Sequence, residues 1–375
     1  MGKLIFVKGE GGLGRTSGGN DHITGLVIYD NELPSGFTTD DRVKHITSVE
    51  DAEAKGITED DYAELHYHIS RFFDIAPAAK LYVGIFADAN ETHDFAEILK
   101  MRDASDGEIL QYVVVPNLAF VETQVTALNL QLAKLEDEKA PSVGVICAKV
   151  SNTTTLPDLR TAGVSNLVSV SIASQDGDKN SYGAAGLIAG AIAKAQVHEN
   201  IGWVAKFNMA LGAEYDVPAL VDGKLVKNLT TQQLADLEDK GYIFLKKYPG
   251  NTGTYFNDTF SCVVPTSDYA YLENNRTMAK AMRLVYSYLL PTFNSPLKVD
   301  ANTGKLAPST CSYFEVLGSK GLEEMERAGE LSGWKVVVDP DQNVLATSEV
   351  EIAMQQVPLG VTRTLKVKIG FTSKV

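Results

Sequence analysis

The alternation of hydrophobic and polar positions between residues 21 and 200 predicts buried strands separated by amphipathic helices. Strands are predicted at 23–29, 81–87, 110–115, 143–150 and 166–172, and helices at 60–73, 94–101, 122–139 and 183–195. Strands that alternate with helices of this length are typical of a parallel or mixed sheet flanked by helices. We therefore expect an α/β domain, with residues 21–265 as its bounds.

Beyond residue 200 the pattern changes. Thr230 and Gln233 have the spacing of a capping box, at the start of a helix that ends at Gly241. The elements predicted after it are a hairpin of strands 242–247 and 254–264, a helix from Ser267 to Pro291, a helical region 309–328, and strands 334–338, 344–354 and 363–371. Helices followed by strands favour a second, smaller α+β domain, which we place at residues 266–356.

The last stretch of the chain has the period-two pattern of a half-buried strand. After Arg363, one face carries Leu365, Val367, Ile369 and Phe371, and the other carries Thr364, Lys366 and Lys368. A chain end usually frays unless something holds it. The pattern therefore predicts a C-terminal arm, residues 357–375, that completes a sheet in this chain or in another copy.

The first residues of the chain form a matching arm, residues 1–20. Its strand is predicted over Leu4, Ile5, Phe6 and Val7, and it is separated from the body by Gly9, Gly11, Gly12 and Gly14. Glycine adopts backbone angles that other residues avoid, so this segment can act as a tether. The sequence thus predicts extended β-strand arms at both ends.

Composition indicates an ordinary folded protein. With 375 residues, 44% hydrophobic and 22% charged, the chain can bury a large core in two or three domains. No secretory signal is evident, and the apolar run 182–193 is too short to span a bilayer. Cys147, Cys262 and Cys311 are odd in number and far apart, which predicts folding in a reducing cytoplasm without disulfides.

The net charge of −14 is unevenly distributed. Residues 356–375 hold four basic residues and no acid, and residues 1–20 hold three basic residues and one acid, which leaves −20 for the body between them. An acidic body disfavours nucleic-acid binding. Basic ends on an acidic body are compatible with two interpretations, self-association of copies and protection of an exposed edge strand against aggregation.

One segment resembles a phosphate-binding loop. Residues 9–16 match G-x-x-x-x-G-K-[ST] except that Arg15 replaces the lysine. The following residues, 17–21, discourage the helix whose N-terminus would bind phosphate, and a guanidinium does not replace a compact ammonium. A flexible tether is the favoured interpretation, and a nucleotide-binding enzyme that uses Gly9–Thr16 is the alternative.

No other pattern predicts chemistry. His66 and His68 are two apart on a predicted helix, so they point in different directions and do not form a metal pair. No G-x-S-x-G elbow is present. We therefore predict no catalytic site, cofactor or metal. A binding protein that forms small closed oligomers is a third hypothesis, besides self-association through the arms and nucleotide binding through residues 9–16.

From about residue 229 to the end of the chain, several segments carry a family resemblance by their order and spacing: 234–244, Asp268, Asn274–Arg276, 329–333, 334–339 and 357–371. In these segments the chain resembles contractile tail sheath proteins of bacteriophages, above all the small sheaths of Mu-like phages and tailocins. The resemblance implies a structural, non-enzymatic virion protein whose residues 21–265 are related in fold to subtilisin-type domains but non-catalytic.

The resemblance also implies an assembly. Sheath subunits stack as hexameric rings in a six-start helix around a tail tube, and their arms add strands to the sheets of neighbouring subunits. A metastable extended state contracts and drives the tube through the target envelope, with no nucleotide and no direct membrane insertion. The implied partners are other copies of the chain, the tail tube protein, and the baseplate and tail terminator proteins.

Assembly in the host bacterial cytoplasm is implied as well. A helix around Glu323, Glu324, Glu326 and Arg327 either faces the tube or is an ordinary solvated helix.

Overall fold

The computed structural model describes residues 20–161, 165–210, 212 and 215–371. The chain forms two compact units, Met1–Lys280 and Ala281–Val375. The predicted N-terminal strand, its glycine tether and the loop at residues 9–16 lie outside the described residues.

The first unit is organised around a seven-stranded sheet of order β2-β3-β1-β4-β5-β6-β9. The strands are β1 (Thr24–Tyr29), β2 (Val43–Ile46), β3 (Leu81–Phe86), β4 (Gln111–Val115), β5 (Val143–Cys147), β6 (Val168–Ser171) and β9 (Tyr242–Ile243). Only β2 is antiparallel to its neighbour. The mixed sheet confirms the predicted α/β class.

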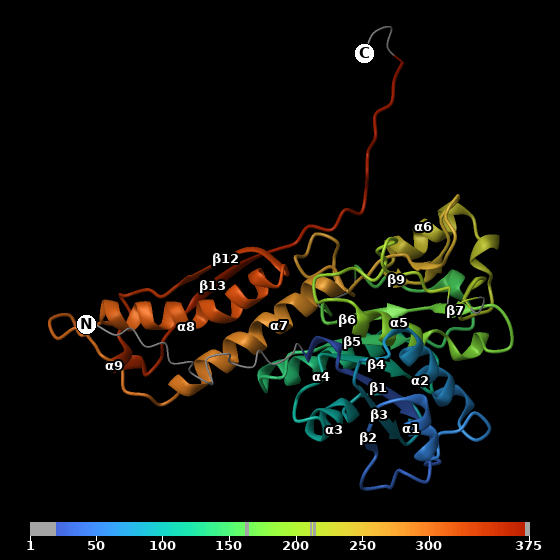
Figure 1. Cartoon of the computed structure of the whole chain (residues 1–375), viewed down its shortest axis with the longest axis horizontal. Helices are drawn as coiled ribbons and strands as arrows, with labels where there is room; N and C mark the ends of the chain where they lie inside the picture. Colours follow the sequence, from blue (N-terminus) through green and yellow to red (C-terminus); the bar gives the residue numbers. More distant parts are fainter. Residues whose placement is uncertain (1–19, 162–164, 211, 213–214, 372–375) are drawn as a thin grey trace, which may run out of the picture. The chain divides into compact units, whose positions relative to one another are not determined.

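Helices cover both faces of this sheet (Figure 1). One core contains side chains of α1 (Val49–Ala54), α2 (Ala63–Ile75) and α5 (Ala185–Lys194), and the other contains side chains of α3 (Glu97–Ala104), α4 (Glu122–Asp137) and α6 (Thr231–Asp239). Successive residues of β1 alternate between the two cores, with Leu26 and Ile28 in the first and Val27 and Tyr29 in the second. Because both faces are covered, all six residues of β1 are buried.

Two helix starts are stabilised by local hydrogen bonds, and the second is the predicted capping box. Ser48 caps α1 and accepts a hydrogen bond from the Asp51 amide. Thr230 and Gln233 form the capping box of α6, each side chain bonding the backbone of the other residue. Short elements complete the unit: β7 (Ala173–Gln175), β8 (Pro218–Leu220), η1 (Asn20–His22), η2 (Thr153–Thr155), η3 (Asn180–Tyr182) and η4 (Val226–Asn228).

The predicted hairpin is shorter than its sequence pattern. Tyr242 and Ile243 join the main sheet beside β6, and only β10 (Leu245–Lys246) and β11 (Tyr255–Phe256) pair with each other. The side chain of Asn257 separates the two pairings. Its Oδ1 accepts from the Phe244 amide at 2.8 Å, and its Nδ2 donates to the Tyr242 carbonyl at 3.1 Å.

The prediction that the long helix starts at Ser267 is wrong, because α7 spans Leu272–Leu289. Residues 270–272 are drawn into backbone pairing with residues 259–261. The Ser261 amide donates to Ala270 at 3.0 Å, and the Leu272 amide donates to Thr259 at 2.8 Å. Ser267 instead forms a local turn in which its hydroxyl accepts from the Tyr269 amide. A helix cannot begin until the chain leaves this pairing.

The second unit contains the C-terminal end of α7, η5 (Leu290–Thr292), α8 (Pro308–Arg327), β12 (Leu331–Val337), α9 (Val344–Thr347) and β13 (Ala353–Pro358). Its core is formed by Leu306, Cys311, Phe314 and Val338. The predicted strand 344–354 is wrong over most of its length: a turn of helix ends at Ser348 in the left-handed region, and the Gln342 side chain bonds both backbone groups of Glu351.

Candidate functional site

The C-terminal segment is extended and unpaired. Residues 359–371 form no strand within the described chain, and Figure 1 shows them continuing past β13 as a plain trace. The apolar face of the predicted strand is exposed to solvent: Leu365 is 82%, Val367 75% and Ile369 91% exposed, and Phe371 is fully exposed. Contiguous exposed apolar side chains of this kind indicate an interaction site, because leaving them in water forfeits burial worth about 1.5–3 kcal/mol each.

The segment follows a small sheet that has room for further strands. β12 and β13 form an antiparallel pair from Leu331↔Pro358 to Val337↔Ala353, and within the described residues neither has a second strand neighbour. Helix α8 covers one face, with Gly318 against Val336 and Met354. An open sheet edge presents unpaired backbone donors and acceptors, to which an extended segment can add as a further strand.

Within the described residues, no other strand pairs with the predicted C-terminal strand, and its apolar face stays exposed. The residues predicted for the N-terminal arm, Leu4 to Val7, and the four tether glycines lie outside the described residues. Arg363, Lys366 and Lys368 lie on the same extended segment as the apolar residues. Strand addition to a neighbouring copy remains a prediction for both arms.

The four charged residues predicted near the end of α8 have different surroundings. Glu324 accepts a hydrogen bond from the Tyr288 hydroxyl, a bond that, together with burial, raises the pKa of Tyr288. Glu326 accepts from Trp334 Nε1 at 2.8 Å. Glu323 and Arg327 form an exposed i,i+4 ion pair with 3.5 Å between Oε1 and Nη2. Glu324 and Glu326 thus bond other elements of the second unit, whereas Glu323 and Arg327 pair with each other on α8.

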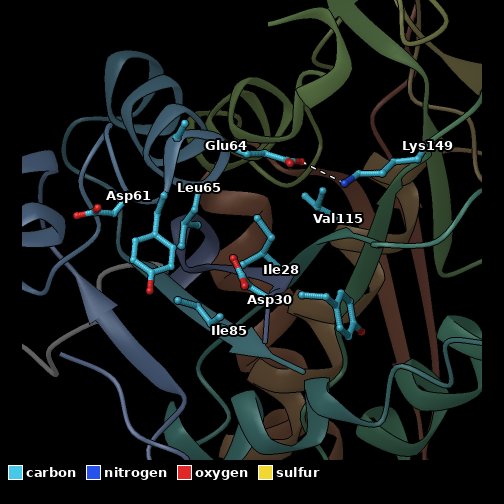
Figure 2. Close-up of a pocket in the computed structure, with 11 residues that line it drawn as sticks. Ile28, Asp30, Asp61, Glu64, Leu65, Ile85, Val115 and Lys149 are labelled. Carbon is cyan, nitrogen blue, oxygen red and sulfur yellow. Dashed lines mark ion pairs between the residues drawn. The ribbon is translucent and has the colours of Figure 1, made fainter. Parts of the chain in front are cut away.

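The first unit contains a pocket of about 160 Å³ at the carboxyl ends of its central strands (Figure 2). Residues of β1, β3 and β4 line it together with the start of α2, and its charged side chains are Asp30, Asp61, Glu64 and Lys149. Glu64 Oε1 and Lys149 Nζ are 3.5 Å apart, and Figure 2 shows their charged ends directed toward each other at one side of the pocket. The lining residues of the described chain include no serine, cysteine or histidine, so the pocket presents carboxylates and an ammonium without a conventional nucleophile–base pair.

Glu64 is the perturbed carboxylate of this pocket. Burial alone would raise its pKa, but contacts with His68 and Lys149 outweigh burial, and the pKa of Glu64 lies below its usual value. No pattern noted in the sequence predicts this pocket. The positions of Asp30 and Lys149 could have indicated it, because each residue follows a buried parallel strand, at the sheet edge where α/β proteins bind ligands.

The other candidate chemical groups are structural. His66 bonds Glu53 at 3.0 Å, whereas His68 is buried and accepts from the Gly186 amide at 3.3 Å. In the described residues, no three metal-ligating side chains come together, and no helix is long and apolar enough to cross a membrane. All three cysteines are buried, and burial raises the pKa of both Cys147 and Cys262, which disfavours their reactive thiolate form.

The fold is similar to those of chains in solved structures of contractile injection systems and tail sheaths. A chain in the cryo-EM structure of the anti-feeding prophage baseplate is similar with a TM-score of 0.63 and 14% identity, covering 99% of this chain and 98% of that chain. A chain of the contracted PVC sheath complex, an extracellular contractile injection system, matches at 0.65 and 12%, covering 94% and 92%. The sheath tail protein of Desulfitobacterium hafniense matches at 0.56 and 10%, covering 96% and 100%.

Two family models match the amino-acid sequence over nearly its whole length. The model described as DUF2586, N-terminal domain, matches residues 1–260, and that described as DUF2586, C-terminal domain, matches residues 268–375. The chain belongs to the DUF2586 family. Comparison with curated proteins gives no match.

Proposed function

We propose that this protein is a structural subunit of a contractile sheath. The observation that carries the proposal is the exposed apolar face of residues 365–371, beside a two-stranded sheet whose outer edges have no strand partner in the described chain. In an isolated subunit the exposed strand-like segment makes no stabilising contact. In a polymer it can, because the segment of one copy can pair with the sheet of the next copy. The sheath fold of the structural neighbours supports this interpretation.

In this proposal, subunits form hexameric rings that stack in a six-start helix around a tail tube. Both arms add strands to neighbouring copies, so the subunits stay linked while the rings rearrange. A contact between two different surfaces repeats without closing and therefore builds a helix. Contraction from a metastable extended state drives the tube through the target envelope, powered by the free-energy difference between two packings and not by catalysis.

The proposed partners are the tail tube protein, the baseplate and tail terminator proteins, and other copies of this chain. The proposed location is the contractile tail of a virion, assembled in the host bacterial cytoplasm. For the tube-facing surface we propose the exposed ion pair Glu323–Arg327, because Glu324 and Glu326 already bond within the second unit.

The proposal is tested by negative-stain microscopy of the purified full-length protein. We expect hollow tubes from the intact chain and none from a variant lacking residues 361–375. The truncated variant should keep its thermal unfolding temperature, because side chains 362–371 are exposed in the subunit. A chain that stays monomeric at high concentration contradicts the sheath function. Tubes from the truncated variant remove the C-terminal arm from it.

A further inference from the structure

The start of helix α7 carries buried polar side chains that strand exchange does not explain. Glu273, Asn275, Arg276 and Thr277 are each no more than 2% exposed. Burying a polar group is unfavourable unless it is hydrogen-bonded, so such a cluster ties the helix to specific partners. Among the described residues, Arg276 has the largest of the fully buried side chains and is 1% exposed. In the sequence, Asn274–Arg276 is notable only as part of the family resemblance.

Arg276 joins two segments that are distant in the sequence. Its Nη1 donates to the Gln196 carbonyl at 3.0 Å, and its Nη2 donates to the carbonyls of Ala195 at 3.1 Å and Asp21 at 3.2 Å. Ala195 and Gln196 follow the end of α5, whereas Asp21 belongs to η1, the first described element. A planar guanidinium with several fixed donors can hold these carbonyls at once, which a lysine cannot do in the same geometry.

Asp21 is the point at which the chain passes from the predicted N-terminal arm into the sheet, because β1 begins at Thr24. Its carboxylate accepts from Lys280 Nζ at 2.6 Å, one helical turn beyond Arg276 on α7. Its carbonyl also accepts from Nε2 of the buried Gln111 at 2.9 Å. Helix α7 therefore holds Asp21 by both its backbone and its side chain.

We propose that Asp21, Arg276 and Lys280 form an arm clamp, which makes the root of the N-terminal arm and helix α7 move as one mechanical element. The inference deepens the proposed sheath function and rests on it. A force that a neighbouring subunit applies to the arm reaches Asp21 first and passes through two charged contacts to α7. Helix α7 continues beyond Lys280 to Leu289 in the second compact unit, so the arm of one subunit is coupled to the unit that carries the two-stranded sheet.

The clamp itself is tested on the unassembled subunit by amide hydrogen exchange of residues 22–26. Losing a charge-assisted hydrogen bond should speed local opening of this segment about tenfold or more in Lys280→Met. The matched control is Lys247→Met, which removes an equally short but exposed ion pair with Asp216 (2.5 Å) and should leave the exchange unchanged. Arg276→Met should have a larger effect, and if it does not fold, Asp21→Asn is the second variant. Equal exchange in Lys280→Met and the control overturns the clamp.

The coupling is tested on assembled protein. Polymers of Lys280→Met should dissociate at a lower guanidinium concentration than polymers of Lys247→Met, although both subunits have the same arms. If the intact chain forms no polymers, the sheath function fails while the exchange result still decides whether the clamp exists. If both variants give polymers of equal stability, the clamp is a local anchor and the proposed coupling is wrong.

Discussion

Gly318 and Gly321 lie almost one turn apart on α8 and face different neighbours. A Cβ added at Gly321 would lie 2.9 Å from Leu284 Cβ and 3.1 Å from the Val285 amide nitrogen of α7. At Gly318 the nearest atom is Met354 Cε at 2.8 Å. The end of a methionine can rotate away, whereas the backbone of a packed helix moves only if the whole helix moves. Gly321 thus sets the α7–α8 distance in the second unit.

We predict that Gly321→Ala lowers the free energy of unfolding of the second unit by about 1–3 kcal/mol through overpacking. Gly318→Ala should be near neutral, because its strain is offset by a helix-propensity gain of about 1 kcal/mol. The chain has two tryptophans, so in a Trp203→Phe background the fluorescence of Trp334 reports denaturant unfolding of this unit alone. Equal losses in the two glycine variants would contradict the packing argument.

The Glu64 carboxylate gives a pH dependence whose sign follows from its lowered pKa. A carboxylate with a lower pKa in the folded state stabilises that state above its ordinary pKa, and the stabilisation disappears as the pH falls through the folded pKa. Glu64→Gln should therefore melt at a lower temperature than the parent at pH 7, with the difference vanishing in acid below the usual glutamate range. Glu91→Gln, at an exposed position, is the control. A difference that is constant with pH would show that Glu64 acts by packing alone.

At the scale of elements, the C-terminal segment has the sequence pattern of a strand, but no strand of the described residues pairs with it. Ile369 is 91% exposed, and Thr364 lies on the opposite face of the predicted strand. We predict that Ile369→Asp prevents polymer formation and that Thr364→Asp, which adds the same charge, permits it. Neither change should alter the thermal unfolding of the subunit. Sedimentation and microscopy measure the outcome, and equal polymerisation by both variants would exclude a strand with one buried face.

The elements that the sequence predicted well are those with strong local signals. The capping box at Thr230 depends on contacts within a few residues, and the buried strand predicted at 23–29 follows from a run of apolar residues. The start of α7 was misplaced because backbone pairing between residues 259–261 and 270–272 overrides the serine cap. The strand predicted at 344–354 failed for a similar reason, since a Gln342 side chain fixes a loop there.

At the scale of the whole molecule, charge should control the rate of assembly. The body carries −20, and residues 356–375 carry +4. Opposite charges steer association, and salt screens them over about 10 Å at 0.1 M. We predict that polymerisation followed by light scattering slows several-fold when NaCl rises from about 50 to about 500 mM. The double variant Lys366→Gln, Lys368→Gln should start slower and respond less to salt; an unchanged salt response would exclude steering by this arm.

The sequence alone determined the α/β class, the sheath resemblance and the alternating pattern of the C-terminal arm, because each depends on local periodicity or on segments read in order. The tertiary structure decided which residues distant in the sequence come into contact. Asp30 and Lys149 line one pocket at a sheet edge. Glu324 and Glu326 accept hydrogen bonds within the second unit. Arg276 donates a hydrogen bond to the Asp21 carbonyl. Such contacts join residues far apart in the chain, and no local pattern encodes them. For residues 359–371 the structure showed what a sequence cannot, that the apolar face of the segment stays exposed in the described part of the chain.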